Sequence, residues 1–421
     1  MIIRKYKPFV VAVTGSVGKT STKDAIYNVL KDQSKFVRKS EKSMNSEIGL
    51  PLTIIGVPNA WHNLGGWMSN IVAGLRLIVR KSSYPDCLIL EIGADHPGDI
   101  QKVTKWLHPD VVVITKISRT PVHVEFFKSP EEVFEEKASL VVAVKSGGTL
   151  VLFADDEKVV SLAERVKGKN VKVFTYGLNE KAMIKGVFGK ILYESGPIGF
   201  IFDVKIEANT IPVTVRNIIG NVYMYPLLAA ASVGHVCSVS AEMLARLLSS
   251  YEAPKGRMNI IPGINNSTII DDTYNSSPDA SLSALETLKD LEVVGINGVI
   301  GKKIAILGDM MELGKFSSEA HRKIGREVVG IADILLTVEQ RSRATAEEAV
   351  LSGMSASSVH SFDTSLEAAD FARTIVKSGD IILVKGSQST RMERVVKALL
   401  REPEKSASLL VRQEKEWLEK R

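Results

Sequence analysis

The sequence predicts an α/β fold with mainly parallel sheets, a small β-rich segment and a second α/β domain. Short apolar runs alternate with longer amphipathic segments along the 421 residues, which is the order expected of βαβ units. The apolar runs are continuous in Val, Ile and Leu, as in strands that helices cover on both faces. Residues 181–215 instead alternate and are rich in turns, which indicates antiparallel hairpins.

Seven strands are expected at apolar runs that end in glycine or polar residues. They are FVVAVTG (9–15), DCLILEIG (86–93), DVVVITKI (110–117), GTLVLFAD (148–155), KIAILGD (303–309), DILLTV (333–338) and DIILVKG (380–386). Amphipathic segments predict helices over 22–32, 131–144 and 317–329. In sheets of this kind, ligands bind at the carboxyl ends of the strands.

A stretch rich in Pro, Gly and charge, EAPKGRMN (252–259), separates a helix from a new strand and is typical of a linker. It divides the chain into a central domain over 1–254 and a second α/β domain over 255–421. The last residues, SASLLVRQEKEWLEKR, predict a charged amphipathic helix or a partly ordered tail.

Composition restricts the class of protein. A hydrophobic content of 45% and a charged content of 24% are typical of a soluble globular protein. The net charge of +6 comes from basic residues spread along the chain, which favours a solvated surface over nucleic-acid binding. Two cysteines exclude a disulfide framework and a cysteine-based zinc site. Because we find neither a membrane-spanning apolar run nor a secretory segment, we expect a cytoplasmic protein.

The segment VAVTGSVGKTS (11–21) runs from an apolar strand through a Gly-rich turn into a helix. The amides of such a turn and the positive end of the helix bind phosphates. Lys19 can reach the β- and γ-phosphates, and the Thr20 hydroxyl can bind Mg²⁺. The turn has the short form TGxxGKT and predicts a P-loop-type ATP site, with an ordinary strand–turn–helix as the alternative. Its members are Thr14, Gly15, Ser16, Gly18, Lys19, Thr20 and Ser21.

Polar side chains also follow neighbouring strands. Glu91 ends the strand in LEIGADHPGDI, where a carboxylate can hold Mg²⁺, and a helix cap or a surface acid is the alternative. His123 follows the next strand, and a role in the site and an ordinary loop histidine are equally supported. Lys137 lies within a predicted helix, where its surroundings do not distinguish it from a solvated surface lysine.

Two strand ends of the second domain carry polar residues. IIDDTYNSSPDA ends a short strand in two acids. Asp272 can accept a hydrogen bond from a ribose hydroxyl, or the acids can belong to a turn and helix cap. Lys385, Gly386 and Ser387 follow another strand and can bind an anion at a helix N-terminus.

The order of these motifs resembles the Mur ligase family of ATP-dependent amide ligases. The resemblance extends from about Val11 to Leu400. It includes TGSVGKTS, NSEIGLPLT (45–53), EIGADHPGDI (91–100), HVEFFKSPEEVFEEKASL (123–140), KGRM (255–258), IDDTYNSSP (270–278), ILGDMMELG (306–314) and LVKGS followed by RMERVV. DDTYNSSP and LGDMMELG are most like the branch that adds D-alanyl-D-alanine to UDP-N-acetylmuramoyl-tripeptide in peptidoglycan synthesis. The resemblance implies a P-loop-type central ATPase domain and a Rossmann-like C-terminal domain.

The resemblance implies metal and phosphate roles for five matching residues. Lys19 corresponds to the lysine that contacts the transferred phosphate. Thr20 and Glu91 correspond to ligands of one Mg²⁺, and His123 to a histidine at a second. Lys137 matches a lysine that the family carbamylates, which gives a carboxylate-like group.

Further roles are implied around the nucleotide and the substrates. Asn221, Arg257 and Asp272 match residues that contact ATP, although Gly220 stands where a histidine usually precedes the asparagine. Substrate binding is implied for Asn45, Tyr274, Asn275, Lys385 and Ser387.

The implied reaction forms an amide bond. The acceptor carboxylate attacks the γ-phosphate of ATP, the amine attacks the resulting acyl phosphate, and phosphate leaves. Two Mg²⁺ ions and Lys19 would neutralise the charge on the transferred phosphoryl group. A hinge near 255–257 would let the second domain close over the first.

The sequence departs from the family in two places. The family normally begins with a domain that holds the UDP part of the acceptor, and here ten residues precede Val11. An insertion over 59–83 holds Trp61 and Trp67. The sequence allows three interpretations of this insertion: a helix without a functional role, an acceptor-binding surface, or a contact with a membrane or a partner. We favour acceptor binding, with ring surfaces from the tryptophans and charge from Arg76, Arg80 and Lys81.

Two other functions stay open. One is a ligase of the same fold with a different acceptor or amine donor, although EIGADHPGDI and LGDMMELG disfavour a folate. The other is a nucleotide-binding protein without turnover. It is disfavoured because Lys19, Thr20, Glu91, His123 and Lys137 occur together.

Overall fold

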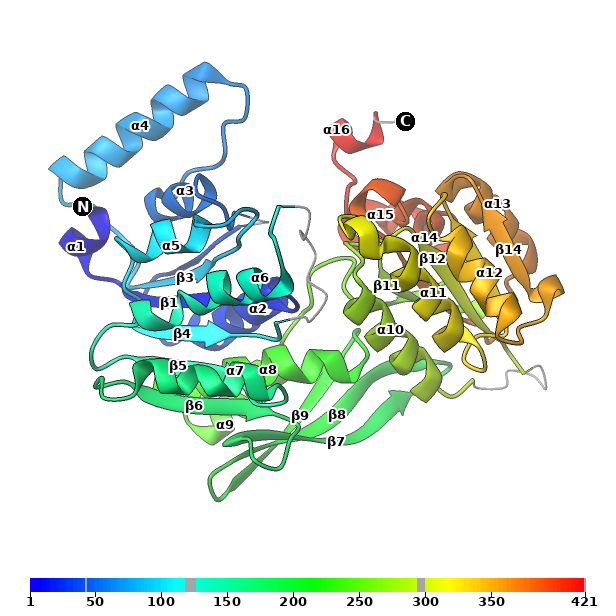
Figure 1. Cartoon of the computed structure of the whole chain (residues 1–421), viewed down its shortest axis with the longest axis horizontal. Helices are drawn as coiled ribbons and strands as arrows, with labels where there is room; N and C mark the ends of the chain where they lie inside the picture. Colours follow the sequence, from blue (N-terminus) through cyan, green and yellow to red (C-terminus); the bar gives the residue numbers. More distant parts are fainter. Residues whose placement is uncertain (42–43, 118–125, 294–299, 420–421) are drawn as a thin grey trace. The chain divides into compact units, whose positions relative to one another are not determined.

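The computed structural model describes residues 1–41, 44–117, 126–293 and 300–419. The chain forms two compact units, which we describe separately (Figure 1). Both contain parallel strands and helices, which confirms the predicted α/β class. The domain boundary at 254/255 stays a prediction, since parts of the β-rich segment group with the second unit. Unit 1 comprises Met1–Val187, Phe202–Val213 and Met224–Tyr251, and unit 2 comprises Phe188–Ile201, Thr214–Tyr223 and Glu252–Arg421.

Six parallel strands form the first part of a nine-stranded sheet, in the order β2-β3-β1-β4-β5-β6. β1, β3, β4 and β5 are the predicted apolar runs, and their interior side chains are buried. β2 and β6 were not predicted, because their side chains are mostly half-buried and not continuously apolar. The bounds are β1 Phe9–Thr14, β2 Val37–Lys39, β3 Cys87–Glu91, β4 Val111–Ile114, β5 Thr149–Phe153 and β6 Lys172–Gly177.

The sheet continues through β7 (Ile184–Tyr193), β8 (Pro197–Ile206) and β9 (Asn209–Arg216), which tight turns connect. Glu207, between β8 and β9, has φ 52°, a left-handed conformation common in hairpin turns. Along β9 every second side chain is buried, from Ile211 to Val215. The structure thus confirms the β-rich segment predicted from alternation.

Helices pack on the strands of unit 1. α2 (Lys19–Leu30) contacts α8 (Met224–Val236) so closely that a Cβ at Gly234 would lie 2.9 Å from Val29 Cγ1. The helix predicted over 131–144 begins at Pro130, where Ser129 caps it, and ends at Ala138 before a 3-10 turn. The other helices are α1 Ile2–Tyr6, α3 Gly49–Ile55, α4 Leu64–Val79, α5 Asp99–Thr104, α6 Pro130–Ala138, α7 Glu157–Val160 and α9 Ala241–Ser249.

Unit 2 holds a six-stranded sheet in the order β10-β11-β15-β12-β13-β14. β10 pairs antiparallel with β11, and the remaining pairs are parallel. The strands are β10 Asn259–Pro262, β11 Thr268–Asp272, β12 Lys303–Gly308, β13 Ile334–Val338, β14 Val359–Phe362 and β15 Ile381–Lys385. The helices are α10 Pro278–Asp290, α11 Ser317–Val328, α12 Arg343–Leu351, α13 Ser365–Ile375, α14 Glu393–Leu399, α15 Ser406–Leu409 and α16 Lys415–Leu418.

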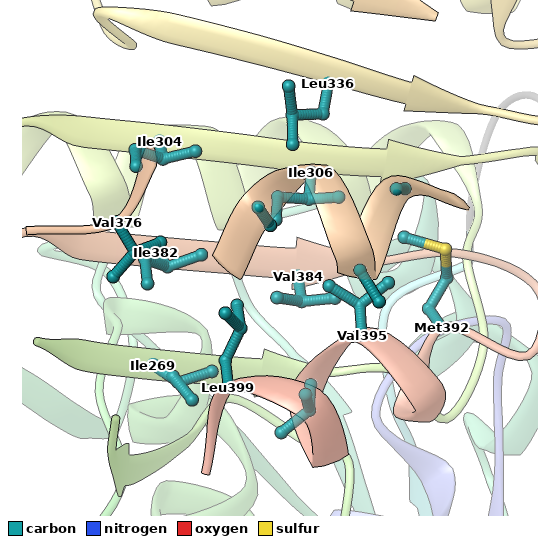
Figure 2. Close-up of a cluster of buried hydrophobic side chains, with 14 of the residues drawn as sticks. Ile269, Ile304, Ile306, Leu336, Val376, Ile382, Val384, Met392, Val395 and Leu399 are labelled. Carbon is teal, nitrogen blue, oxygen red and sulfur yellow. The ribbon is translucent and has the colours of Figure 1, made fainter. Parts of the chain in front are cut away.

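An apolar cluster lies between one face of this sheet and the helices α13 and α14 (Figure 2). Alternate residues of each strand enter it, such as Ile304 and Ile306 or Ile382 and Val384, because side chains on a strand point to opposite faces in turn. Each large side chain buried in this way stabilises the fold by about 1.5–3 kcal/mol.

The C-terminal segment is fixed to unit 2 through Arg412, although the sequence allowed a partly ordered tail. The Arg412 side chain is buried and donates to the Thr273 carbonyl oxygen over 3.0 Å. It also pairs with Glu393 Oε2 over 3.2 Å. The C-terminal segment forms two short helices, α15 before the buried Arg412 and α16 after it.

Candidate active site

Two glycines shape the turn between β1 and α2. Gly15 has φ +148°, and a Cβ there would lie 2.0 Å from Thr115 Oγ1. Gly18 precedes the first helical residue with φ +83°. Both conformations favour glycine, so the backbone itself selects the TGxxGKT form. The amides of Ser16 and Val17 donate to the Lys116 carbonyl oxygen over 2.8 and 3.2 Å, which ties the turn to the segment after β4.

Lys19 begins α2, and its side chain folds back over the turn. Its Nζ donates to the carbonyl oxygens of Gly15 and Ser16 over 3.0 and 3.4 Å. A cation is thus held at the positive end of a helix, where an anion is the expected ligand.

Glu91 lies at the carboxyl end of β3, in register with Val13 of β1. Its Oε1 accepts from Thr20 Oγ1 over 3.2 Å and from Asn45 Nδ2 over 3.3 Å. The Oε2 atom is buried and has no hydrogen-bond partner in the part of the chain that the structure describes. The structure therefore brings together Thr20 and Glu91, which the sequence assigned to one metal site, and Asn45, which it assigned to substrate binding.

Lys23 is a site residue that the sequence reasoning missed. It lies one turn after Lys19 on α2, is 2% exposed, and places Nζ 3.6 Å from Glu91 Oε2. It is also 3.6 Å from Asp24 Oδ1. The spacing of four residues from Lys19 was a usable signal, because residues i and i+4 share a helix face.

Lys137 is buried on α6, and only the structure distinguishes it from a surface lysine. Burial, aided by the charge of Lys19, lowers the pKa of Lys137 to about 7, while Asp95 and Glu136 oppose the shift. The Glu136 carboxylate accepts from the amides of Gly98, Ile100 and Gln101 at the start of α5. A buried amine that is partly neutral near pH 7 therefore lies within electrostatic range of Lys19.

Of the other predicted residues of unit 1, one lies outside the described residues and two form hydrogen bonds to neighbouring segments of the chain. His123 lies outside the described residues. Thr14 is buried, and its hydroxyl donates to the Ile92 carbonyl oxygen over 2.8 Å. The Ser21 carbonyl oxygen accepts from Tyr251 over 3.3 Å. Thr14 and Ser21 are thus bonded to neighbouring segments of unit 1.

In unit 2, the structure joins Asp272 at the end of β11 to Lys385 at the end of β15. The two residues are paired in the sheet register, and Asp272 Oδ2 lies 2.5 Å from Lys385 Nζ. Lys385 is 2% exposed and also donates to the Asn275 carbonyl oxygen over 3.0 Å. The charge of Lys385 is therefore already matched by Asp272, which fixes the orientation of that carboxylate.

Asp271 is the second titratable group at this position, and the sequence did not single it out. Its Oδ1 accepts from the Thr273 amide and hydroxyl over 3.2 and 2.6 Å, whereas Oδ2 has no hydrogen-bond partner among the described residues. Burial, aided by the charges of Asp272 and Glu393, raises the pKa of Asp271 to about 7, while the hydrogen bonds from Thr273 oppose the shift.

The remaining predicted residues of unit 2 form two local groups. The Ser387 hydroxyl donates to the Asp309 carbonyl oxygen over 2.6 Å and accepts from the Met311 amide over 2.9 Å. The Arg257 guanidinium lies 4.2 Å from the centre of the Tyr274 ring. Asn221 belongs to unit 2 and is exposed, after Gly220 at φ +108°.

The insertion over 59–83 contains α4 and an exposed loop. Trp61 is 76% exposed, and its carbonyl oxygen accepts from Trp67 Nε1 over 2.9 Å. Asn63 caps the start of α4 by accepting from the Gly66 amide. No helix in the described residues has the length and hydropathy of a membrane span.

A separate cavity of about 490 Å³ opens at the amino ends of β1, β4, β5 and β6. Asp110, Gly148 and Lys172 are among the residues that line it. It lies at the sheet edge opposite Glu91, so it does not contain the phosphate-loop residues.

Comparisons with known proteins place the chain in one family. The model of the Mur ligase middle domain matches residues 13–65 and 69–234. The model of the Mur ligase, glutamate ligase domain matches residues 256–388.

Individual relatives are ligases. The UDP-N-acetylmuramoyl-tripeptide–D-alanyl-D-alanine ligase of Bacillus subtilis is 26% identical, over 94% of this chain and 76% of its own. The enzyme of that name from Mycobacterium tuberculosis is 28% identical, over 93% of this chain and 72% of its own. The solved structure of MurF ligase from Thermotoga maritima in complex with ADP has a TM-score of 0.75 at 26% identity, covering 96% of this chain and 82% of that one.

Proposed function

This chain belongs to the Mur ligase family, and we propose that it is an ATP-dependent carboxylate–amine ligase. The proposed reaction adds D-alanyl-D-alanine to UDP-N-acetylmuramoyl-tripeptide, as the names of the relatives state for those proteins. The observation that carries this proposal is the convergence of Lys19, Thr20 and Glu91 at one end of two paired strands. We place the reaction in the cytoplasm, where ATP is available.

The proposed chemistry has two steps. An oxygen of the acceptor carboxylate bonds to the γ-phosphorus of ATP, and the bond to the β-phosphate oxygen breaks to release ADP. The amine of the dipeptide then attacks the acyl phosphate, loses a proton and expels inorganic phosphate. Lys19 at the start of α2 stabilises the negative charge on the transferred group.

Thr20 and Glu91 fit a Mg²⁺ ion. Mg²⁺ takes oxygen ligands and keeps few protein contacts beside phosphate and water. The two side chains supply a hydroxyl and a carboxylate already in contact, and the buried Oε2 of Glu91 has no hydrogen-bond partner among the residues that the structure describes. When bound, the ion would neutralise phosphate charge. A second ion held by His123 is part of the proposal from the family resemblance.

Carbamylation of Lys137 is supported by its burial and its lowered pKa. A neutral amine attacks CO₂ and releases one proton, which leaves a carbamate in place of a buried ammonium. At pH 7 a lysine of pKa about 7 is roughly half neutral, whereas an ordinary lysine is almost entirely protonated. The carbamate would be an anionic group near Lys19.

We propose that unit 2 supplies further nucleotide and substrate contacts. Asp272, oriented by Lys385, would accept from a ribose hydroxyl. Arg257 and Asn221 are the other proposed ATP contacts. Substrate contacts are proposed for Asn45, Tyr274, Asn275, Lys385 and Ser387. Trp61, with its exposed ring, is proposed as a contact for the acceptor.

The test measures phosphate release and product mass for the purified chain with ATP and Mg²⁺. UDP-muramoyl peptides and dipeptides are supplied together and singly. The proposal expects ADP, phosphate and one amide product when UDP-N-acetylmuramoyl-tripeptide and D-alanyl-D-alanine are both present. An amide product from a different pair would reject these substrates but keep the ligase chemistry. No amide product from any pair would favour a nucleotide-binding protein without turnover.

A further inference from the structure

Helix α4 exposes a continuous apolar stripe. Residues at spacings of three and four share one side of a helix. The six apolar side chains that form the stripe follow this spacing and fall within an arc of about 100° around the helix axis. Each of them is more than half exposed, although apolar groups of this size are usually buried in a soluble domain. They are Leu64, Met68, Ile71, Val72, Leu75 and Val79.

The other side of α4 faces unit 1. Gly74 and Asn70 are buried, and a Cβ at Gly74 would lie 3.4 Å from Ile55 Cδ1 of α3. Asn70 Nδ2 donates to the Pro58 carbonyl oxygen over 2.9 Å. The helix thus lies beside α1 and α3 of unit 1 (Figure 1). The exposed fractions of the stripe residues show that this side of the helix is not covered by the described residues.

Basic residues flank the stripe, and acids are missing from the sequence around it. Between Glu47 and Asp86 the chain contains no Asp or Glu, and α1 lies in an acid-free segment that ends before Asp24. Lys5 of α1 donates to the Leu77 carbonyl oxygen over 2.8 Å, so the basic end of α1 adjoins the end of α4. The exposed basic side chains are Arg4, Lys5, Lys7, Arg76, Arg80 and Lys81.

We propose that α4 docks in the plane of an anionic lipid bilayer. Its apolar stripe would enter the boundary of the acyl chains, and the basic residues would contact headgroup phosphates. At 16 residues the helix is about 24 Å long, and its opposite face is held by α3, so it lies along the surface.

The chemistry favours lipid over two other occupants. A second copy would bring a second set of basic residues to the face without acids in this segment to match them. A nucleotide-linked acceptor needs hydrogen-bonding partners, which six aliphatic or thioether side chains do not offer.

The test is flotation of the full chain with vesicles of phosphatidylcholine and phosphatidylglycerol, and with phosphatidylcholine alone. We expect the wild type to float with the mixed vesicles, and more weakly with the neutral ones. The double variant Ile71→Asp, Leu75→Asp should bind at least about tenfold more weakly. The triple variant Arg76→Gln, Arg80→Gln, Lys81→Gln should lose about a hundredfold on mixed vesicles and little on neutral ones.

The matched control is Leu351→Asp, Leu366→Asp, which removes two exposed apolar side chains from unit 2. It should float like the wild type. Thermal unfolding and ADP binding serve as fold controls for every variant. Flotation that the stripe variant leaves unchanged would overturn the proposal, and so would equal binding to both vesicles. Self-association that the stripe variant abolishes, without vesicle binding, would also overturn it in favour of a second copy.

Discussion

The Thr20 hydroxyl donates to the Glu91 carboxylate over 3.2 Å, across 71 positions of sequence. This contact joins the first turn of α2 to the carboxyl end of β3. The ammonium of Lys23 forms an ion pair with the other oxygen of the same carboxylate. The proposed phosphate-loop and metal residues and the counter-ion Lys23 therefore all contact or adjoin one buried side chain.

Replacing Lys19 with alanine should lower kcat by about 10²–10³-fold, because a charge that stabilises the transition state is lost. The melting temperature should stay within a few degrees of wild type, since the hydrogen bonds of Lys19 Nζ to the Gly15 and Ser16 carbonyl oxygens lie within the turn and not in the apolar core. Phosphate release in a coupled assay measures the effect, with the exposed Lys35→Ala as control. Wild-type turnover by the Lys19 variant would reject the phosphate-loop assignment.

Glu91→Gln should raise the Mg²⁺ concentration for half-maximal activity at least about tenfold, because a charged ligand becomes neutral. It should also lower the free energy of unfolding by about 3 kcal/mol, since Lys23 loses a buried counter-charge and keeps Asp24 as its partner among the described residues. Adding Lys23→Met should restore stability without activity. Denaturant unfolding tests this, and a double variant no more stable than Glu91→Gln would contradict the ion pair.

A Lys137→Ala enzyme should lose activity and regain part of it when acetate or another short carboxylic acid is added. The added acid replaces the anionic group that a carbamate would provide, whereas Lys137→Arg places a cation there and should not be rescued. Phosphate release with increasing acetate measures the recovery. Full activity of either variant without acid would make carbamylation unnecessary.

Asp271 should make the stability of the protein depend on pH between about 4 and 7. Its pKa is raised from 3.8 in the unfolded chain to about 7 in the fold, so the folded state holds the proton more tightly. The stability contributed is complete below the lower value and is lost as pH rises through the upper one, by about 1.4 kcal/mol per pH unit at most. Asp271→Asn should remove this slope in denaturant titrations. If the Asn variant keeps the same slope, the pKa of Asp271 is not raised by folding.

Trp61→Ala should raise the acceptor KM by about tenfold and leave the KM for ATP unchanged, because an aromatic contact with the acceptor is removed. The exposed Trp106→Ala is the matched control. Steady-state kinetics with each substrate varied separates the two constants. If the acceptor KM is the same in both variants, the acceptor is held elsewhere.

Local sequence patterns predicted most of the architecture. Continuous apolar runs gave the parallel strands correctly, because a strand covered on both faces needs apolar side chains at every position. The sequence also predicted the Gly-rich turn between β1 and α2, where Gly15 and Gly18 adopt backbone conformations that favour glycine. The sequence did not predict edge strands such as β2 and β14, because strands with half-buried side chains have no continuous apolar run.

Tertiary structure decided which polar groups are buried and what they touch. Lys137 looks like a surface lysine until α6 packs, and Lys385 meets Asp272 across 113 positions. The apolar stripe of α4 reads in the sequence as an ordinary amphipathic helix, yet the structure turns it outward. Contacts between segments that are distant in the sequence decide which polar side chains are buried and which groups they bond to. These contacts therefore determine the desolvation, the pKa and the exposure of each side chain. The sequence by itself thus determined the continuously apolar strands and the Gly-rich turn, while long-range packing determined the chemistry of the lysines.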